Sequence, residues 1–114
     1  MLKKIVIITY ILLFYNFNSF AEGNQKYLKV GLLAPFSGEY KDMGQSIMLS
    51  LQLALDEIDD DKIKIFPRDS GFNNPEKLIQ SVESLKDENI KIVIGPISQE
   101  DFKMLSNYKD MIFI

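Results

Sequence analysis

Residues 28–38 read LKVGLLAPFSG, and this stretch decides the fold. The run from Leu28 to Ala34 is almost continuously apolar and Pro35 closes it, which is typical of a strand buried on both faces of a parallel sheet. Residues 90–98 read IKIVIGPIS and repeat the pattern of an apolar run, a small residue, a proline, one more apolar residue and a serine. We therefore expect two central strands that end in similar turns.

The residues between these two runs predict two helices and another strand. Apolar side chains recur at helical spacing over residues 45–58, and isoleucines alternate with lysines over 62–65, as in a strand nearer the sheet edge. Asn74 and Pro75 suit the N-cap and first position of a helix that runs to Glu88, with Asn89 as a left-handed stop. The apolar stripe of the first helix comprises Ile47, Leu51, Ala54, Leu55 and Ile58.

Ser98 is expected to open a third helix. Asp101 follows three residues later, as in a looser form of the capping box, and we assign Phe102 and Leu105 to the buried side. Four strands thus alternate with three helices, so the expected fold is α/β, an open parallel sheet with flanking helices. The strands are expected at 28–34, 59–69 (after an initial turn), 90–95 and 111–114, and a turn-rich loop at 36–44.

The two ends of the chain carry separate expectations. A pair of lysines, a ten-residue apolar run at 5–14 and a small-x-small exit ending at Ala21 have the layout of a secretory signal peptide, with cleavage before Glu22 and export to the periplasm. The run is shorter than the roughly 20 residues that span a bilayer, and an uncleaved anchor is the alternative. Residues 22–114 are expected to be an N-terminal α/β lobe, incomplete because the second lobe is absent.

The composition excludes several functional classes. The chain has no cysteine and no histidine, which removes disulfides, thiolate nucleophiles, cysteine-type zinc sites and the usual general base. Residues 22–114 carry 11 basic and 16 acidic side chains, a net charge of −5, without a basic run that would suggest nucleic acid. The acidic residues at 59–61 lack the spacing of a calcium loop and indicate a solvated turn. We expect no enzyme, no cofactor and no metal.

Ligands of open α/β sheets bind beyond the carboxyl ends of the strands, where the strand order reverses. If the two central strands are neighbours, as in a flavodoxin-like order, their exit turns are the two lips of one crevice. Ser37 and Ser98 offer hydroxyls there, and a helix start at Ser98 would attract an anion such as a carboxylate. Each serine also has a purely structural interpretation, Ser37 as a turn residue and Ser98 as an N-cap.

Tyr40 and Asp69 are further candidates at the same end of the sheet. Tyr40 is either a wall for the ligand or a surface aromatic, and Asp69 either holds a ligand ammonium or caps its own turn. The glycine patterns of phosphate-binding loops are absent, and neither serine has a histidine partner. The chemistry at this end fits a small polar ligand.

Three segments together resemble the N-terminal lobe of type I periplasmic binding proteins, the Leu/Ile/Val-binding class. They are KVGLLAPFSGEYKDMGQSIMLSLQLALDEI at 29–58, DSGFNNPEKLIQSVESL at 69–85 and IKIVIGPIS at 90–98. The resemblance implies two Rossmann-like lobes that close on branched-chain amino acids or related small molecules and deliver them to an inner-membrane ABC permease. It also implies ligand contacts from the loop after the first strand and the turn after the third. On this sequence these contacts are Tyr40, Gly95, Pro96, Ile97 and Ser98.

One branch of this family gives a different implication. The segments FPRDSGFNNPEKLIQSVESL and IVIGPIS look like the penicillin-binding-protein activators, which share the fold, regulate peptidoglycan synthesis and would have a penicillin-binding protein as partner. An enzyme of flavodoxin-like fold is a third interpretation, for which no catalytic set is visible. Without a second lobe, the chain is not expected to bind its ligand tightly.

Overall fold

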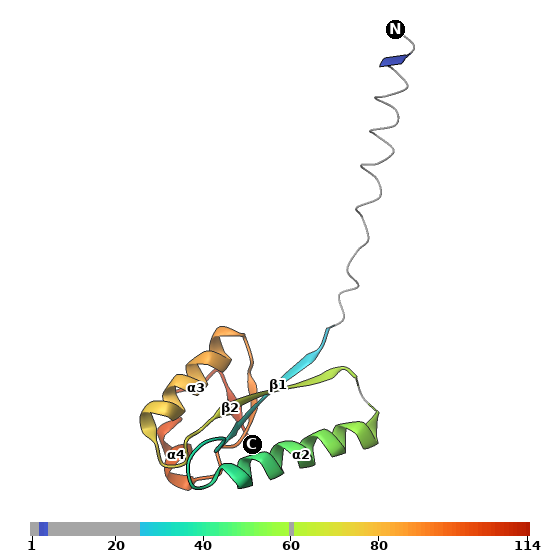
Figure 1. Ribbon diagram of the computed structural model, residues 1–114. Helices are drawn as coiled ribbons and strands as arrows, with labels where there is room; N and C mark the ends of the chain where they lie inside the picture. Colours follow the sequence, from blue (N-terminus) through green and yellow to red (C-terminus); the bar gives the residue numbers. More distant parts are fainter. Residues whose placement is uncertain (1–2, 5–25, 60) are drawn as a thin grey trace.

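The computed structural model describes residues 3–4, 26–59 and 61–114, so the predicted signal peptide and its cleavage site lie outside the described residues. From residue 26 onward, the described residues form four strands that alternate with three helices, as the periodicity predicts (Figure 1). Among the described residues, no helix combines the length and apolarity needed to cross a membrane. In chain order, the elements are β1 (Leu28–Ala34), α2 (Lys41–Ile58), β2 (Ile63–Asp69), α3 (Pro75–Asp87), β3 (Ile92–Ile94), α4 (Gln99–Met104) and β4 (Ile112–Phe113).

The strands form one parallel sheet in the order β2-β1-β3-β4. The chain moves from β1 to one side, returns past β1 to β3, and continues to β4, so the strand order reverses between β1 and β3. Because parallel crossovers are right-handed, the reversal places α2 on one side of the sheet and α3 on the other (Figure 1). The α/β open-sheet prediction is confirmed, including the edge position of β2.

The hydrophobic core lies between the sheet and the α3 layer. Leu33 from β1 and Val93 from β3 meet the inner face of α3, and both are fully buried. Asn74 caps α3 by accepting the backbone N–H of Lys77, with Pro75 at the first helical position, as predicted. The helix and loop residues of this core are Leu78, Val82, Leu85, Ile90, Leu105 and Met111.

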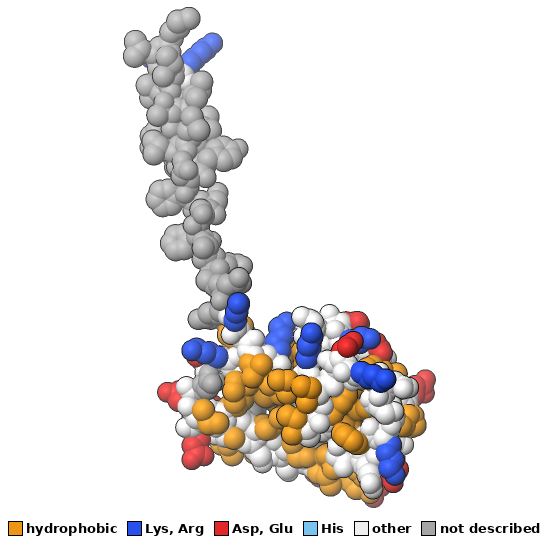
Figure 2. Space-filling view, turned by 180° about the vertical axis from the view of Figure 1, so that it is seen from behind, with side chains coloured by type: hydrophobic (Ala, Val, Ile, Leu, Met, Phe, Trp, Pro, Cys, Tyr) orange, Lys and Arg blue, Asp and Glu red, His pale blue; other side chains and the backbone are white. Residues whose placement is uncertain are grey.

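The opposite face of the sheet is only partly covered, because α2 packs against β1 and leaves β3 and β4 bare on that side. Ile92 and Ile94 are half-buried there, while Ile112 is 61% and Ile114 75% exposed. The expectation that β3 is buried on both faces therefore holds only for its α3 side. Figure 2 shows hydrophobic side chains gathered into a continuous patch on the back of the lobe.

The first helix starts earlier than its sequence pattern predicts. It begins at Lys41 rather than Gln45, within the expected loop, and Tyr40 occupies the N-cap without a capping side chain. Gly44 was read as a loop residue, but it lies inside the helix where α2 crosses the end of β1. A Cβ at Gly44 would come within 1.9 Å of the Pro35 carbonyl oxygen, so this glycine permits close packing.

Three apolar assignments were wrong. Ala54 and Ile58 are exposed, because the sheet-facing side of α2 is formed by Ile47, Leu51 and Leu55 and the helix end runs past the sheet. In α4, Phe102 is 51% exposed and Asp101 takes the buried position, at 1% exposure. The reason is helical geometry, since Asp101 and Leu105 are four residues apart and share the inner face.

Candidate functional site

The two proline-serine turns lie at the same rim of the sheet, as predicted. β1 and β3 are adjacent and parallel, so the turns at 35–38 and 95–98 leave the sheet side by side. The turn at 70–74 follows β2 at the same rim, and Ser70 N–H donates to the carbonyl of Ala34 at 2.9 Å. These three turns are the candidate site, here called the carboxyl-end rim.

Asp69 is the electrostatic centre of the carboxyl-end rim. Its Oδ1 accepts the backbone N–H of Phe36 and of Gly71, each at 2.9 Å, and thereby joins the turns after β1 and β2. Burial alone would raise the pKa of Asp69. Hydrogen bonds from Ser37, from the Phe36 and Gly71 N–H groups and from Lys77 outweigh burial and lower the pKa to about 2.

Lys77 completes this cluster and was missed by the sequence analysis. Its Nζ lies 2.9 Å from Ser37 Oγ and 3.3 Å from Asp69 Oδ2. The available signal was its position three residues after the Asn74 N-cap, where the first turn of α3 starts beside the rim. Ser37, Asp69 and Lys77 therefore form one charged cluster in which every member has a protein partner.

Ser98 belongs to a second cluster on the other side of the rim. It is the N-cap of α4, as predicted, and its Oγ accepts the backbone N–H of Asp101 at 3.4 Å. The same Oγ lies 2.5 Å from Asn73 Oδ1. Asp101 Oδ2 in turn accepts the Asn73 N–H at 3.1 Å, so the loop after β2 is tied to the start of α4.

The loop at 70–74 connects both clusters and adds an aromatic pair. Its residues Gly71, Phe72 and Asn73 have φ values of 66°, 39° and 55°, a left-handed run that reverses the chain sharply. The Phe72 ring lies with its centroid 4.2 Å from that of Tyr40, which is 38% exposed. In this loop the sequence predicts only the Asn74 cap, because Phe72 and Asn73 contact residues far away in the chain.

The turn after β3 exposes backbone and one apolar side chain. Gly95 has φ of 95° and is joined to Pro96 by a cis peptide bond, and its N–H donates to the carbonyl of Ile114 at 2.8 Å. Ile97 is 43% exposed, while Ser98 behind it is 6% exposed. The predicted contacts thus divide into an outward set, Tyr40 and Ile97, and an inward set, Ser37, Asp69 and Ser98.

The rim can therefore offer a small molecule an aromatic wall, an aliphatic wall and the backbone between them. The inward hydroxyls and carboxylate stabilise the turns that carry those walls. A direct ligand contact from any of the seven predicted residues stays a prediction.

Replacing Ser98 by Ala is expected to lower the free energy of unfolding by about 2 kcal/mol. About half comes from the lost cap and half from the lost hydrogen bond to Asn73. Urea unfolding of the full chain measures the change, with Ser106→Ala, an exposed serine of the α4–β4 segment, as the matched control. Equal effects of the two variants would contradict the role of Ser98 at the rim.

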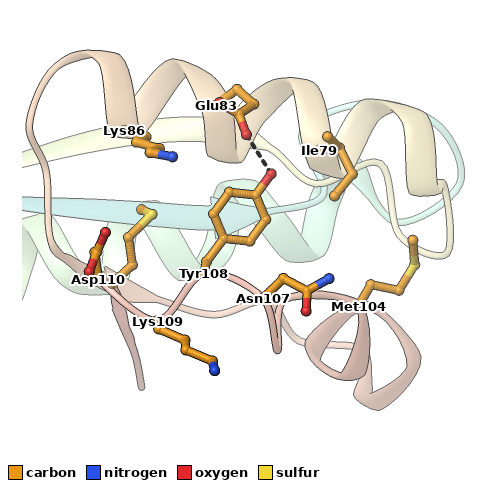
Figure 3. Close-up of a pocket in the computed structure, with 9 residues that line it drawn as sticks. Ile79, Glu83, Lys86, Met104, Asn107, Tyr108, Lys109 and Asp110 are labelled. Carbon is orange, nitrogen blue, oxygen red and sulfur yellow. Dashed lines mark hydrogen bonds between the residues drawn. The ribbon is translucent and has the colours of Figure 1, made fainter.

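A cavity of about 350 Å³ lies away from the carboxyl-end rim, between α3 and the segment that leads into β4 (Figure 3). Met104 and Met111 contribute apolar lining, and Tyr108 donates a hydrogen bond to Glu83 at 2.7 Å. Burial and the hydrogen bond with Glu83 raise the pKa of Tyr108 to about 12.

Comparison with known proteins gives a family and a fold. The sequence profile of a family described as periplasmic binding protein matches residues 27–110. No curated protein sequence matches the chain.

Three solved structures resemble the chain in fold. An ABC transporter substrate-binding protein from Sphaerobacter thermophilus aligns with a TM-score of 0.67 and 19% identity over 75% of this chain and 25% of its own. An ABC-type branched-chain amino acid transporter protein from Rhodopseudomonas palustris aligns with a TM-score of 0.62 and 20% identity, over 75% of this chain and 26% of its own. The C-domain of LpoA from Haemophilus influenzae, a regulator of PBP1A, aligns with a TM-score of 0.58 and 21% identity, over 75% of this chain and 26% of its own. The chain spans about a quarter of the length of each.

Proposed function

The chain belongs to the periplasmic binding protein family, and on this premise we propose that it forms the first lobe of a solute-binding receptor for an ABC transporter. The ligand class we propose is branched-chain amino acids or related small molecules. The protein would act in the periplasm after cleavage between Ala21 and Glu22, would have an inner-membrane ABC permease as partner and would catalyse no reaction. A second lobe would close over the carboxyl-end rim.

The single observation that carries this proposal is the adjacency of β1 and β3. It puts the turns at 35–38 and 95–98 at one rim, at the point where the strand order reverses. Tyr40 and Ile97 are exposed at this rim and suit an aliphatic side chain of a ligand. The backbone between Tyr40 and Ile97 suits hydrogen bonds with the polar groups of the ligand.

The proposal is tested by titrating the ¹⁵N-labelled chain with leucine, isoleucine and valine. We expect chemical-shift changes confined to residues 35–40 and 95–98, with millimolar affinity, because one lobe buries only part of the ligand. Tyr40→Ala should abolish these changes, and Tyr27→Ala should leave them intact. Tyr27 is the matched control because it is 39% exposed, almost the same as Tyr40, and lies at the opposite end of the sheet. Shift changes elsewhere, or none, would contradict the receptor proposal.

The likeness to the LpoA C-domain favours a second candidate, a regulator of cell-wall synthesis. A regulator needs a protein-binding surface rather than a ligand cleft. No response to any amino acid, together with capture of a purified penicillin-binding protein by the chain, would support this candidate over the receptor.

A further inference from the structure

Three lysines stand in a row across the amino-terminal ends of the strands. Lys29 of β1 is in register with Lys64 of β2. On the other side, Val30 is in register with Ile92, so Lys91 lies beside Lys29. All three side chains are exposed. We call Lys29, Lys64 and Lys91 the lysine row.

Like charges at paired positions of neighbouring strands are destabilising, and nothing in the described parts of the chain neutralises the lysine row. Within residues 3–4, 26–59 and 61–114, none of its members forms an ion pair. Glu88 lies nearby, but its carboxylate is held by Arg68 at 2.7 Å, and Lys29 reaches only its backbone carbonyl, at 3.4 Å. Lys64 Nζ lies 3.7 Å from the ring centroid of Tyr27, and Lys29 Nζ lies 5.7 Å from that of Phe66, but neither ring carries a negative charge. The row therefore presents three positive charges without a carboxylate partner to an external anion.

A cavity of about 330 Å³ opens beside the lysine row, at the base of β1 and β3. Lys29, Lys91 and Asn89 supply hydrogen-bond donors to its wall, and Tyr27, Leu28 and Ile92 supply apolar surface. Tyr27 is 39% and Leu28 48% exposed, although both adjoin charged side chains. Proteins that bind a lipid interface combine such side chains. Their lysines attract the anionic headgroups, and an aromatic ring and a leucine contact the hydrocarbon.

The position of this surface in the chain favours a membrane over a soluble anion. The lysine row lies at the end of the sheet opposite the carboxyl-end rim, next to the start of β1, whose place in the fold is seen in Figure 1. In sequence, residues 15–26 alone separate Tyr27, the first residue of this surface, from the apolar run at 5–14. Before the cleavage proposed above, while that run is in a bilayer, the lysine row is kept close to the bilayer surface.

We propose that the lysine row and the adjoining cavity are a docking surface for anionic phospholipid headgroups. The phosphate lies between Lys29 and Lys91, Lys64 adds charge, and Tyr27 and Leu28 contact the acyl boundary. The carboxyl-end rim then faces away from the membrane and stays open. This inference concerns the chain before the proposed cleavage. It does not depend on the proposed ligand, because it concerns the opposite end of the sheet.

The test measures binding of the full chain to vesicles at 0.1 M NaCl. Vesicles of phosphatidylcholine with 30% phosphatidylglycerol are compared with pure phosphatidylcholine vesicles, and the ratio of the two partition coefficients is the readout. The apolar run and Lys3 and Lys4 are present in every variant, so their effect is common to all. The triple variant Lys29→Gln, Lys64→Gln, Lys91→Gln is expected to lower the ratio about 100-fold, since each lysine near an anionic surface contributes roughly fivefold.

The matched control replaces three exposed lysines elsewhere, Lys41, Lys103 and Lys109, by Gln. It removes the same charge and should change the ratio by less than about threefold. An equal loss in both triple variants would show an effect of net charge and overturn the proposal, as would no loss in the first. Circular dichroism checks that both variants fold.

A second titration distinguishes the source of the phosphate. If inorganic phosphate or glycerol 3-phosphate saturates the cavity at micromolar concentration while phosphatidylglycerol vesicles do not bind, the site takes a soluble anion and the membrane proposal is wrong. Shift changes at Lys29, Asn89 and Lys91 with anionic vesicles alone support it.

Discussion

Gly95→Ala is expected to lower the free energy of unfolding by about 3 kcal/mol, a large share of the stability of a small domain. Two costs combine. The φ of Gly95 is 95°, where an L-residue is strained by 1–2 kcal/mol or so. A Cβ at Gly95 would also lie 2.2 Å from the carbonyl oxygen of Leu33, and such overpacking typically costs about 1–3 kcal/mol.

The clash cannot relax cheaply, because Leu33 belongs to β1, the central strand, and its side chain is fully buried. The change is measured as a shift in the urea midpoint of the full chain. Gly38→Ala separates the two costs, since Gly38 has φ of 75° but nothing within 4 Å of its Cβ position. We expect Gly38→Ala to cost about 1 kcal/mol. A loss at Gly95 no larger than at Gly38 would show that Gly95 and the end of β1 are not in rigid contact.

Because of Asp69, the free energy of unfolding of the lobe is expected to fall at acid pH. Its pKa is about 2 in the folded chain, against 3.8 as the ordinary value. Because the folded pKa is the lower one, the stabilisation is fully present above pH 4 and is lost as the pH falls through 2. The shift corresponds to about 2 kcal/mol, reasonable for a side chain that is 23% exposed and accepts several hydrogen bonds.

The measurement is urea unfolding at pH values from 2 to 6. Asp69→Asn should lower stability at pH 6 by about 2 kcal/mol and flatten the acid part of the curve, because Asn cannot ionise. Asp61→Asn removes one negative charge from the turn before β2 and serves as the control. A curve for Asp69→Asn that keeps its full slope between pH 4 and 2 would assign the acid sensitivity to other carboxylates.

Both predictions concern how the carboxyl-end rim is held together. Its polar side chains join three turns to one another. Its outward surface is formed by Tyr40, Ile97 and backbone. Asp69 joins the first two turns and Asn73 joins the second to the third. A ligand-binding rim built in this way is stiff before the ligand arrives, which reduces the ordering cost of binding.

Much of the fold follows from local patterns in the sequence. The strand at 28–34, the Asn74 and Ser98 caps and the left-handed Asn89 follow from neighbouring residues, and the structure confirms each of them. The strand expected at 90–95 is present but shorter, at Ile92–Ile94. The adjacency of the two central strands was a condition of the predicted crevice, because right-handed crossovers restrict the strand order without choosing the side on which β3 lies, and the sheet order β2-β1-β3-β4 meets it. The ends of the elements do not follow from these patterns, since α2 begins at Lys41 and not at Gln45.

The sequence by itself therefore determined an α/β lobe whose two proline-serine turns share one rim, because strand burial, helix caps and crossover handedness act locally or by general rule. Only the tertiary structure decided which side chains meet there. The contacts of Lys77 with Ser37, of Asn73 with Ser98 and of Phe72 with Tyr40 join residues 25 to 40 positions apart. No periodicity records such contacts, since they depend on how three turns converge after the sheet has formed.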